Sequence, residues 1–469
     1  MILMPKKYCL ATLVLVASGI SVAEADQKDN PASASANIGV SASAPAAATA
    51  DVPAPSRKKA RAKKVAAPAN PAASAAAVAP SLSGASESAK ATAASNSTVH
   101  STSAEKDSAD KTAATAPPAI TDQQMFKFGG FGTLGVSHSS MKSADYVIDS
   151  DMPKGAGRSS DWSASNNVRV TAHVTADFTP RVSAILQVDS EYRSDGSYRP
   201  EIEWFNVKYA FTPDVYMRVG RVALPTFMDS ENRDVGYSYV WVNPPADLYH
   251  QLSIPNSDGV DLVYRSEIGE AGNTFKAIYG TNTEKSPNSE STSRDLWGIF
   301  DTFEYGPAIF HLSYQQRRSS SRNLQTGVSG EWNNYSDLSV GASYDPGNWF
   351  VISEWVQHRS TTKVDAMYFS GGYRINKFTP YFTYGQNSAG SFLSDSAPSA
   401  AAIERANRAQ STTGVGLRWD FMRNYDFKVQ YDQVQLSNDS NGYLINVPTG
   451  VTLYGSKFHV ISAVVDFVF

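Results

Sequence analysis

The chain has 469 residues, with 41 lysines and arginines against 45 aspartates and glutamates, and a formal net charge of −4. This balance gives no indication of nucleic-acid binding and excludes a strongly basic protein. The length leaves room for several domains, or for one large barrel with an extension.

The first 25 residues are typical of a secretory signal peptide. Lys6 and Lys7 provide a basic start, and the apolar stretch at residues 8–22 follows directly. Ala23 and Ala25 then form a small-x-small cleavage site. The apolar stretch is shorter than the roughly 18 residues that a membrane helix needs, so we expect an exported protein without a helical anchor.

Cysteine usage agrees with export. The only cysteine, Cys9, lies inside the expected signal, so the mature protein would have neither a thiol nor a disulfide. The residues before Cys9 lack the small apolar pattern of a lipid-attachment site, and no lipid anchor is expected.

Residues 26–122 differ in composition from the rest of the chain. They are rich in Ala, Ser and Pro and contain no aromatic residue. Such a segment buries too little apolar surface to offset its chain entropy, so we expect a disordered periplasmic linker. The basic run at residues 56–64, SRKKARAKK, is either a solvated charge run that keeps the linker extended or a contact with an anionic polymer such as peptidoglycan.

From residue 123 to the end, alternating segments of about ten residues are joined by tight turns and long polar loops in strict alternation. Seven turns and eight loops predict about sixteen strands, with both chain ends on the short-turn side. The tight turns are expected at residues 178–181, 211–214, 267–273, 305–307, 345–348, 376–380 and 422–425. The long loops are expected at residues 139–163, 193–201, 223–257, 281–294, 317–334, 359–365, 387–411 and 435–457.

The alternation separates two faces. In residues 166–178 an apolar row runs from Val168 to Phe178, and the opposite row holds Arg169, His173 and Asp177. A soluble sandwich would bury one row in a packed core, but here the polar row carries too many charges and aromatic residues border the apolar row. Only helices and closed barrels satisfy the backbone in hydrocarbon. We therefore predict an all-β protein, a transmembrane antiparallel β-barrel with a water-filled lumen.

The last ten residues, VISAVVDFVF, predict how the barrel closes. Ile461, Val465 and Phe469 lie on an apolar row, whereas Ser462 and Asp466 lie on the other. This strand is expected to pair with the first one, near residues 126–138, and to place its apolar row in lipid.

Four stretches resemble the sixteen-stranded general porins of Gram-negative outer membranes. They are FGGFGTLGVSH (128–138), VYMRVGRVALPTFMDSE (215–231), SDGVDLVYRS (257–266) and VVDFVF (464–469), and the likeness covers roughly residues 126–469. It implies an outer-membrane homotrimer, with a terminal Phe that serves as an assembly signal. It also implies a third loop, from about Val222 to Asn256, that folds into the barrel. The loop departs from the pattern: its stretch DVGYSYVWVNPPADLYHQLSIPNS (234–257) has three prolines and lacks the usual acidic constriction signature, and the Ala-rich tail is foreign to the family.

On this resemblance, we expect acids of the third loop to face basic wall residues across a narrow gap, where their transverse field would favour small polar solutes. Alternatively, these charges are only solvated lumen residues. The loop candidates are Asp229, Glu231, Arg233, Asp234 and Asp247, and the inward wall candidates are Arg169, Lys208, Arg218, Arg374, Arg418 and Lys428.

Four aromatic residues of the same loop allow two interpretations. Tyr237, Tyr239, Trp241 and Tyr249 form either a slide for sugars or aromatic solutes, or a packing surface that holds the loop against the wall.

The charge of the barrel gives one further indication. Subtracting the 12 basic and 9 acidic residues before residue 126 from the 41 and 45 in the whole chain leaves 29 and 36. The net charge of −7 favours a mild preference for cations.

The expected domains are the signal peptide at 1–25, the linker at 26–122 and the barrel at 123–469. The expected function is an outer-membrane porin for passive diffusion of small hydrophilic solutes and ions, with lipid as surroundings. No catalytic residue, cofactor or metal site is expected, because the seven histidines lie in no HExxH motif and GxSxG is missing. The alternative is a structural barrel whose basic tail tethers the outer membrane to peptidoglycan.

Overall fold

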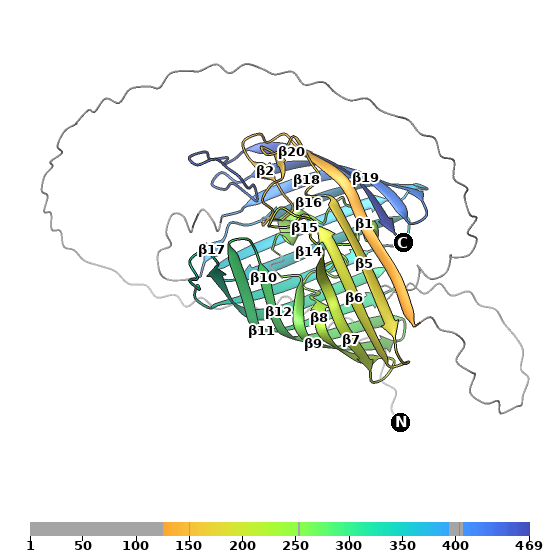
Figure 1. Ribbon diagram of the computed structural model, residues 1–469. Coiled ribbons are helices and arrows are strands. Elements are labelled where there is room, and N and C mark those ends of the chain that lie inside the picture. Colours follow the sequence, from red (N-terminus) through yellow and green to blue (C-terminus); the bar gives the residue numbers. More distant parts are fainter. Residues whose placement is uncertain (1–124, 150, 252–253, 394–402, 404–406) are drawn as a thin grey trace, which may run out of the picture. The chain divides into compact units, whose positions relative to one another are not determined.

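The computed structural model describes residues 125–149, 151–251, 254–393, 403 and 407–469 (Figure 1). The expected signal peptide with its cleavage residues Ala23 and Ala25, and the expected linker with its basic run, lie outside the described residues.

Sixteen strands of nine or more residues, counted over the described part of the chain, form one closed antiparallel barrel. Strand β1 pairs with β5 on one side and with β20 on the other, from Phe131–Val468 to Ser139–Val460, which closes the cylinder. The predicted fold class, strand number and closure are confirmed. The sixteen strands are β1 (Phe126–Ser139), β5 (Val168–Asp177), β6 (Val182–Glu191), β7 (Glu201–Ala210), β8 (Val215–Ala223), β9 (Asn256–Ile268), β10 (Ala271–Lys285), β11 (Ser289–Tyr305), β12 (Ala308–Asn323), β13 (Asn333–Tyr344), β14 (Trp349–Arg359), β15 (Thr362–Tyr373), β16 (Phe378–Asn387), β18 (Gln410–Met422), β19 (Tyr425–Leu436) and β20 (Lys457–Val468).

The seven tight turns lie where the turn residues predict them. Gly306 and Asn424 adopt positive φ angles of 55° and 66° in two of these turns, a conformation that Gly and Asn adopt at low cost. Three loops are shorter than predicted, at 286–288, 324–332 and 360–361, because the neighbouring strands continue past their apolar part. Polar strand ends keep the antiparallel ladder once they leave the bilayer, so the fall in hydropathy marks the membrane boundary and not the end of a strand.

Short elements lie in the long loops. The first loop, residues 140–167, holds β2 (Asp145–Tyr146), β3 (Ala156–Gly157) and β4 (Trp162–Ser163). The third loop, here residues 224–255, holds the 3-10 helix η1 (Gly236–Ser238) and the helix α1 (Ala246–Tyr249), and β17 (Ser391–Phe392) follows β16.

Within the described ranges, no helix has the length and apolar character to cross a membrane.

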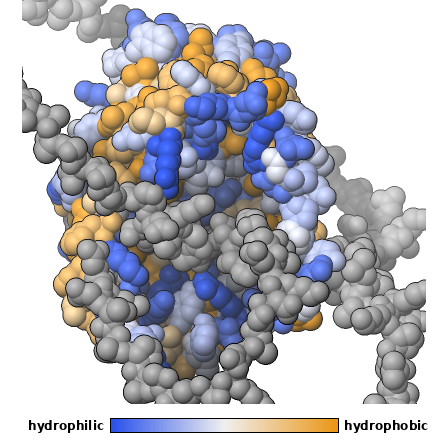
Figure 2. All heavy atoms as spheres, turned by 90° about the vertical axis from the view of Figure 1, so that its right-hand side faces the viewer, coloured by the Kyte–Doolittle hydropathy of each residue, from blue (hydrophilic) through white to orange (hydrophobic). Residues whose placement is uncertain are grey.

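The two faces of the barrel differ as the alternation predicts. Val170, Val415 and Leu417 are exposed on the outside, whereas Arg169, Thr171 and other inward residues are buried. Near the short turns, Phe378 stacks on Trp419 and Tyr344 lies against Trp349 on the outer surface. Figure 2 shows hydrophobic residues on the outer margin of the barrel end and hydrophilic residues around its recessed centre. An apolar outer band bordered by aromatics around a polar interior is the surface of a membrane-spanning barrel.

The outward position of Val415, near the middle of β18, gives a test of this orientation. Val415→Arg places a charge in the hydrocarbon and is expected to destabilise the folded barrel by ~2–4 kcal/mol. Urea unfolding in lipid vesicles measures the effect, with Val415→Leu as the matched apolar control. Equal stability of the two variants would show that Val415 does not face lipid.

Candidate functional site

The third loop folds inward and crosses the lumen. Between Thr226 and Asp247 it bonds directly to strands that are spread around the whole barrel: β5, β7, β10, β12, β14, β15, β18 and β19. Ser313 of β12 donates to the carbonyl of Thr226, and Gln410 of β18 donates to Asp247 at 3.0 Å. The loop is therefore held to strands on several sides of the barrel and not to one wall.

An apolar cluster anchors the loop to β14, β15 and β16. Trp241 meets the ring of Tyr368 edge-on at 5.7 Å, and its indole N–H donates to the hydroxyl of Ser370 at 2.9 Å. Tyr239 and Trp241 are buried in this cluster, Tyr249 packs against its edge, and Tyr237 lies against the guanidinium of Arg418 at 4.9 Å. The geometry therefore favours packing over a solute slide for these aromatics. The buried cluster consists of Phe227, Tyr239, Trp241, Leu248, Phe350, Val356, Ala366, Tyr368 and Tyr381.

A network of charges holds the middle of the loop against β5, β6 and β7. Asp234 forms an ion pair with Arg169 of β5 and lies 3.5 Å from Arg233. Arg233 lies 3.8 Å from Glu203 of β7, and Arg169 lies 3.8 Å from Glu191 of β6. Burial alone would raise the pKa of Asp234, but Arg233 and Arg169 outweigh it and hold this pKa below its ordinary value. Asp234 is therefore ionised at neutral pH.

Two further ion pairs lie on the β8–β10 side. Glu231 of the loop pairs with Lys276 of β10. Arg218 binds Asp261 of the neighbouring strand β9 with two of its nitrogens, and Asp261 is buried. Arg218 thus forms this ion pair within the wall, and the loop acid Glu231 also attracts it electrostatically.

A second network supports η1 from the β19–β20 side. Lys428 is fully buried, lies 2.9 Å from Asp466 and donates to the carbonyl of Gly236 at 2.6 Å. Arg418 lies 3.1 Å from Asp426 and donates to the carbonyls of Tyr237 and Tyr239. These two cations bind the backbone of the loop while wall acids balance their charge.

A glycine is needed at the tip of this network. A Cβ atom at Gly236 would collide with the carboxylate of Asp466 and lie near the hydroxyl of Thr133. The loop backbone therefore approaches the wall closely only because residue 236 has no side chain.

The remaining residues predicted from the sequence take no part in the ion pairs described above between the loop and the wall. The backbone N–H of Asp229 donates to the Tyr249 hydroxyl at 3.1 Å, and its carboxyl has no ion pair in the described structure. Lys208 lies over the ring of Tyr216 near the short turns. Arg374 follows the end of β15 and pairs with Asp345 of the adjacent turn at 2.6 Å. The structure does not bring Lys208 or Arg374 to the loop.

Several residues of this site were missed from the sequence. Lys276 and the wall acids Glu203, Asp426 and Asp466 give the wall charges of both signs, whereas the prediction assigned the wall bases only. A signal was present for the apolar anchor: the inward positions of β14 and β15 include Phe350, Val356 and Tyr368, and apolar residues facing a water-filled lumen require a cover.

Within the described residues, no group of three or more His, Cys, Asp and Glu side chains is arranged to hold a metal ion.

No family model matches the chain, and no curated protein gives a significant match. Solved structures with a similar fold include an anion-selective porin from Comamonas acidovorans, at 13% identity, with 73% of this chain and 99% of that chain covered and a TM-score of 0.48. The outer membrane channel DcaP of Acinetobacter baumannii matches at 12% identity, 73% and 97% coverage and a TM-score of 0.48. Salmonella typhi OmpF, solved with daunomycin, matches at 12% identity, 73% and 97% coverage and a TM-score of 0.45. The likeness at this identity concerns the fold.

The buried charge of Lys428 gives a prediction for stability. Lys428→Met leaves Asp426 and Asp466 buried without this cation, and removal of one partner of a buried pair typically costs ~3–5 kcal/mol. Urea unfolding of the purified protein should show a loss of this size. Lys142→Met is the control, since its pair with Asp161 is exposed and screened by water, and its loss should change the stability far less. A Lys428→Met variant as stable as this control would contradict the buried network.

The loop acid Asp247 gives a prediction for pH dependence. Burial raises the pKa of Asp247 to about 6, above its ordinary value of 3.8. Its contribution to loop docking is therefore complete below pH 4 and is lost as the pH rises through about 6. Hydrogen exchange of peptides covering α1, corrected for intrinsic rates, should show more protection at pH 5 than at pH 7.5. Asp247→Asn should abolish the difference, and greater protection at pH 7.5 would contradict the assignment.

Proposed function

We propose that the protein is an outer-membrane porin that admits small hydrophilic solutes and ions by passive diffusion, with the third loop as its constriction. One observation carries the proposal: a closed sixteen-stranded barrel has an apolar outer band and a charged, polar interior. Such a barrel encloses an aqueous path through a bilayer and requires no catalytic step.

The charges around the loop support a selective passage. Glu231, Arg233 and Asp234 keep 15%, 24% and 18% of their side-chain surface exposed in the lumen, so both signs of charge border the water there. Opposed fixed charges in a narrow aqueous gap disfavour apolar solutes, because ordered water has to be displaced. The loop's contacts with eight strands support a passage smaller than that of an open barrel.

The proposed setting is the bacterial outer membrane, with the short turns and the N-terminal linker on the periplasmic side. The division into a signal peptide at 1–25, a linker at 26–122 and a barrel at 123–469 is part of the proposal, as are the homotrimer and the assembly role of Phe469. The basic run at 56–64 is a proposed contact with peptidoglycan, secondary to the channel.

Single-channel recording in planar bilayers tests the function. The full-length protein should give small, steady conductance steps in multiples of three, and the reversal potential under a salt gradient should show a mild preference for cations. Loss of residues 228–247, replaced by a short Gly-Ser linker, should raise the conductance severalfold, because the constriction is removed. Shortening the last loop, residues 437–456, by the same linker is the control and should change the conductance less.

Two results would contradict the proposal. The proposal of passive diffusion is wrong if the intact protein shows no conductance and only the loop-deleted variant conducts. The proposal that the third loop constricts the channel is wrong if deletion of residues 228–247 leaves the conductance unchanged.

A further inference from the structure

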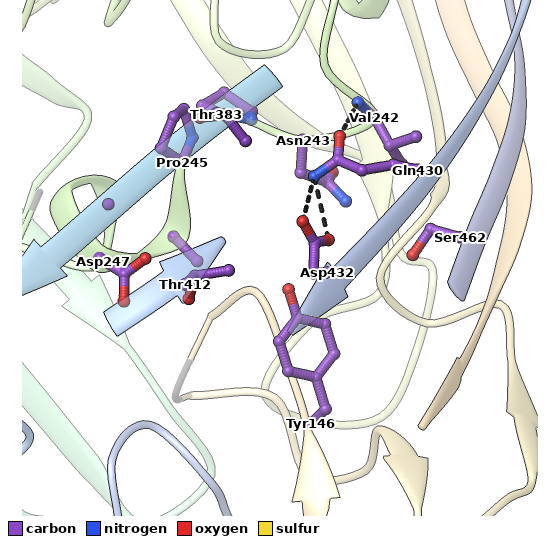
Figure 3. A pocket seen from close by; sticks show the side chains of 13 residues that line it. Tyr146, Val242, Asn243, Pro245, Asp247, Thr383, Thr412, Gln430, Asp432 and Ser462 are labelled. Carbon is purple, nitrogen blue, oxygen red and sulfur yellow. Dashed lines mark hydrogen bonds between the residues drawn. The ribbon is translucent and has the colours of Figure 1, made fainter. Parts of the chain in front are cut away.

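A polar cavity lies between the third loop and the wall formed by β16, β18, β19 and β20 (Figure 3). Its cavity volume is about 30 Å³, and it opens into a wider space of about 430 Å³ that includes bulk solvent. Two acids, Asp247 of α1 and Asp432 of β19, belong to its lining, and the prolines Pro244 and Pro245 provide an apolar side. The other lining residues are Tyr146, Val242, Asn243, Ala246, Thr383, Gly385, Thr412, Gln430 and Ser462.

The two carboxylates of the cavity are buried and are bound by neutral donors. Asp247 is 1% exposed and Asp432 is 6% exposed. The side-chain amide of Gln410 donates to Asp247 at 3.0 Å, and that of Gln430 donates to both oxygens of Asp432 at 2.9 and 3.0 Å. These donors are neutral, and neither acid forms an ion pair within the described structure. By contrast, Asp466 faces Lys428.

A glycine of the wall lies against each carboxylate. A Cβ atom at Gly385 of β16 would lie 2.7 Å from an Asp247 oxygen, and one at Gly414 of β18 would collide with Asp432. The strands therefore have glycines at the two positions where any larger residue would push the carboxylates out of place.

The amide of Gln430, which binds Asp432, is fixed in orientation. The side-chain oxygen of Gln430 accepts the backbone N–H of Val242 at 3.0 Å and the hydroxyl of Tyr381 at 2.7 Å. Its NH₂ group therefore points toward Asp432. The hydroxyl end of Tyr146, from the first loop, is also directed at Asp432 (Figure 3). Two carboxylates thus line one cavity together with neutral hydrogen-bonding groups.

We propose that this cavity binds a small organic cation, a protonated amine on a short hydroxylated carbon chain, during passage through the channel. The ammonium group lies between Asp247 and Asp432, where it balances two buried charges that the protein leaves uncompensated. The methylene groups lie against Pro244 and Pro245, and the hydroxyl groups exchange hydrogen bonds with the neutral side chains. The space is larger than a bare metal ion needs. This inference rests on the proposed function, because the channel supplies the solute.

Three probes of nearly equal size test the charge requirement: ethanolamine, ethylene glycol and glycolate. Isothermal titration calorimetry on the full-length protein in detergent at pH 7.5 should show ethanolamine binding at least about tenfold more tightly than the other two, as for charge-assisted hydrogen bonds. Equal binding of the three, or tighter binding of glycolate, would overturn the inference. Complete displacement of ethanolamine by equimolar potassium would also overturn it, in favour of an inorganic cation site.

Isosteric variants locate the site. Asp247→Asn and Asp432→Asn should each weaken ethanolamine binding about tenfold, because each removes one charge and retains a hydrogen-bond acceptor. Asp439→Asn, at an exposed position of the last loop, is the matched control and should bind as the unchanged protein does. Gel mobility with and without heating checks that each barrel is folded. Unchanged binding by the folded double variant would place the amine elsewhere and refute the site.

Bilayer recording separates this inference from the proposed function. Steady conductance that ethanolamine does not reduce more than ethylene glycol does would refute the amine site while leaving the porin intact. Calorimetric binding without any conductance would refute the porin and leave a cation-binding barrel.

Discussion

The barrel depends on one constraint: in hydrocarbon, no backbone N–H or C=O group has water as a partner. The pairing of β1 with β20 satisfies this constraint, since it removes the two edges that an open sheet would expose. Every other feature follows from closure. Alternating side chains have to sort into a lipid row and a lumen row, and the enclosed lumen becomes the place where charged residues are tolerated.

The third loop uses that tolerance in two ways. On one side it excludes water, with Trp241 and Tyr368 in an apolar cluster of the kind that a soluble core contains. On the other sides its backbone and acids are held by Lys428, Arg418 and Arg169, whose charges are balanced by neighbouring acids. Buried charges of this kind add little net stability over apolar packing, but a misplaced loop would leave them unpaired. The network therefore selects one position of the loop.

The sequence predicts the fold because the determining signals are local: a period of two along each strand and turn residues between strands. It predicts the site only in part. Alternation puts Arg374 in phase with the inward residues of β15, but phase contains no information on height along the barrel, and Arg374 lies at a turn. The pair of Glu231 with Lys276 joins residues 45 positions apart, and no pattern in the sequence indicates it. The inward apolar residues of β14 and β15, in contrast, could have predicted that a loop packs against them.

The seam between β1 and β20 has a consequence for biogenesis. Gly130 and Phe469 exchange two backbone hydrogen bonds, at 3.0 and 2.9 Å, and the Phe469 ring occupies the space above Gly130. Nearby, Thr133 bonds Asp466 across 333 positions of the chain. Strand β1 therefore gains its second partner only when β20 is in place. Closure pairs segments of maximal sequence separation, and such pairing is entropically costly and slow. A chain without β20 would leave β1 and β19 each with an unpaired edge.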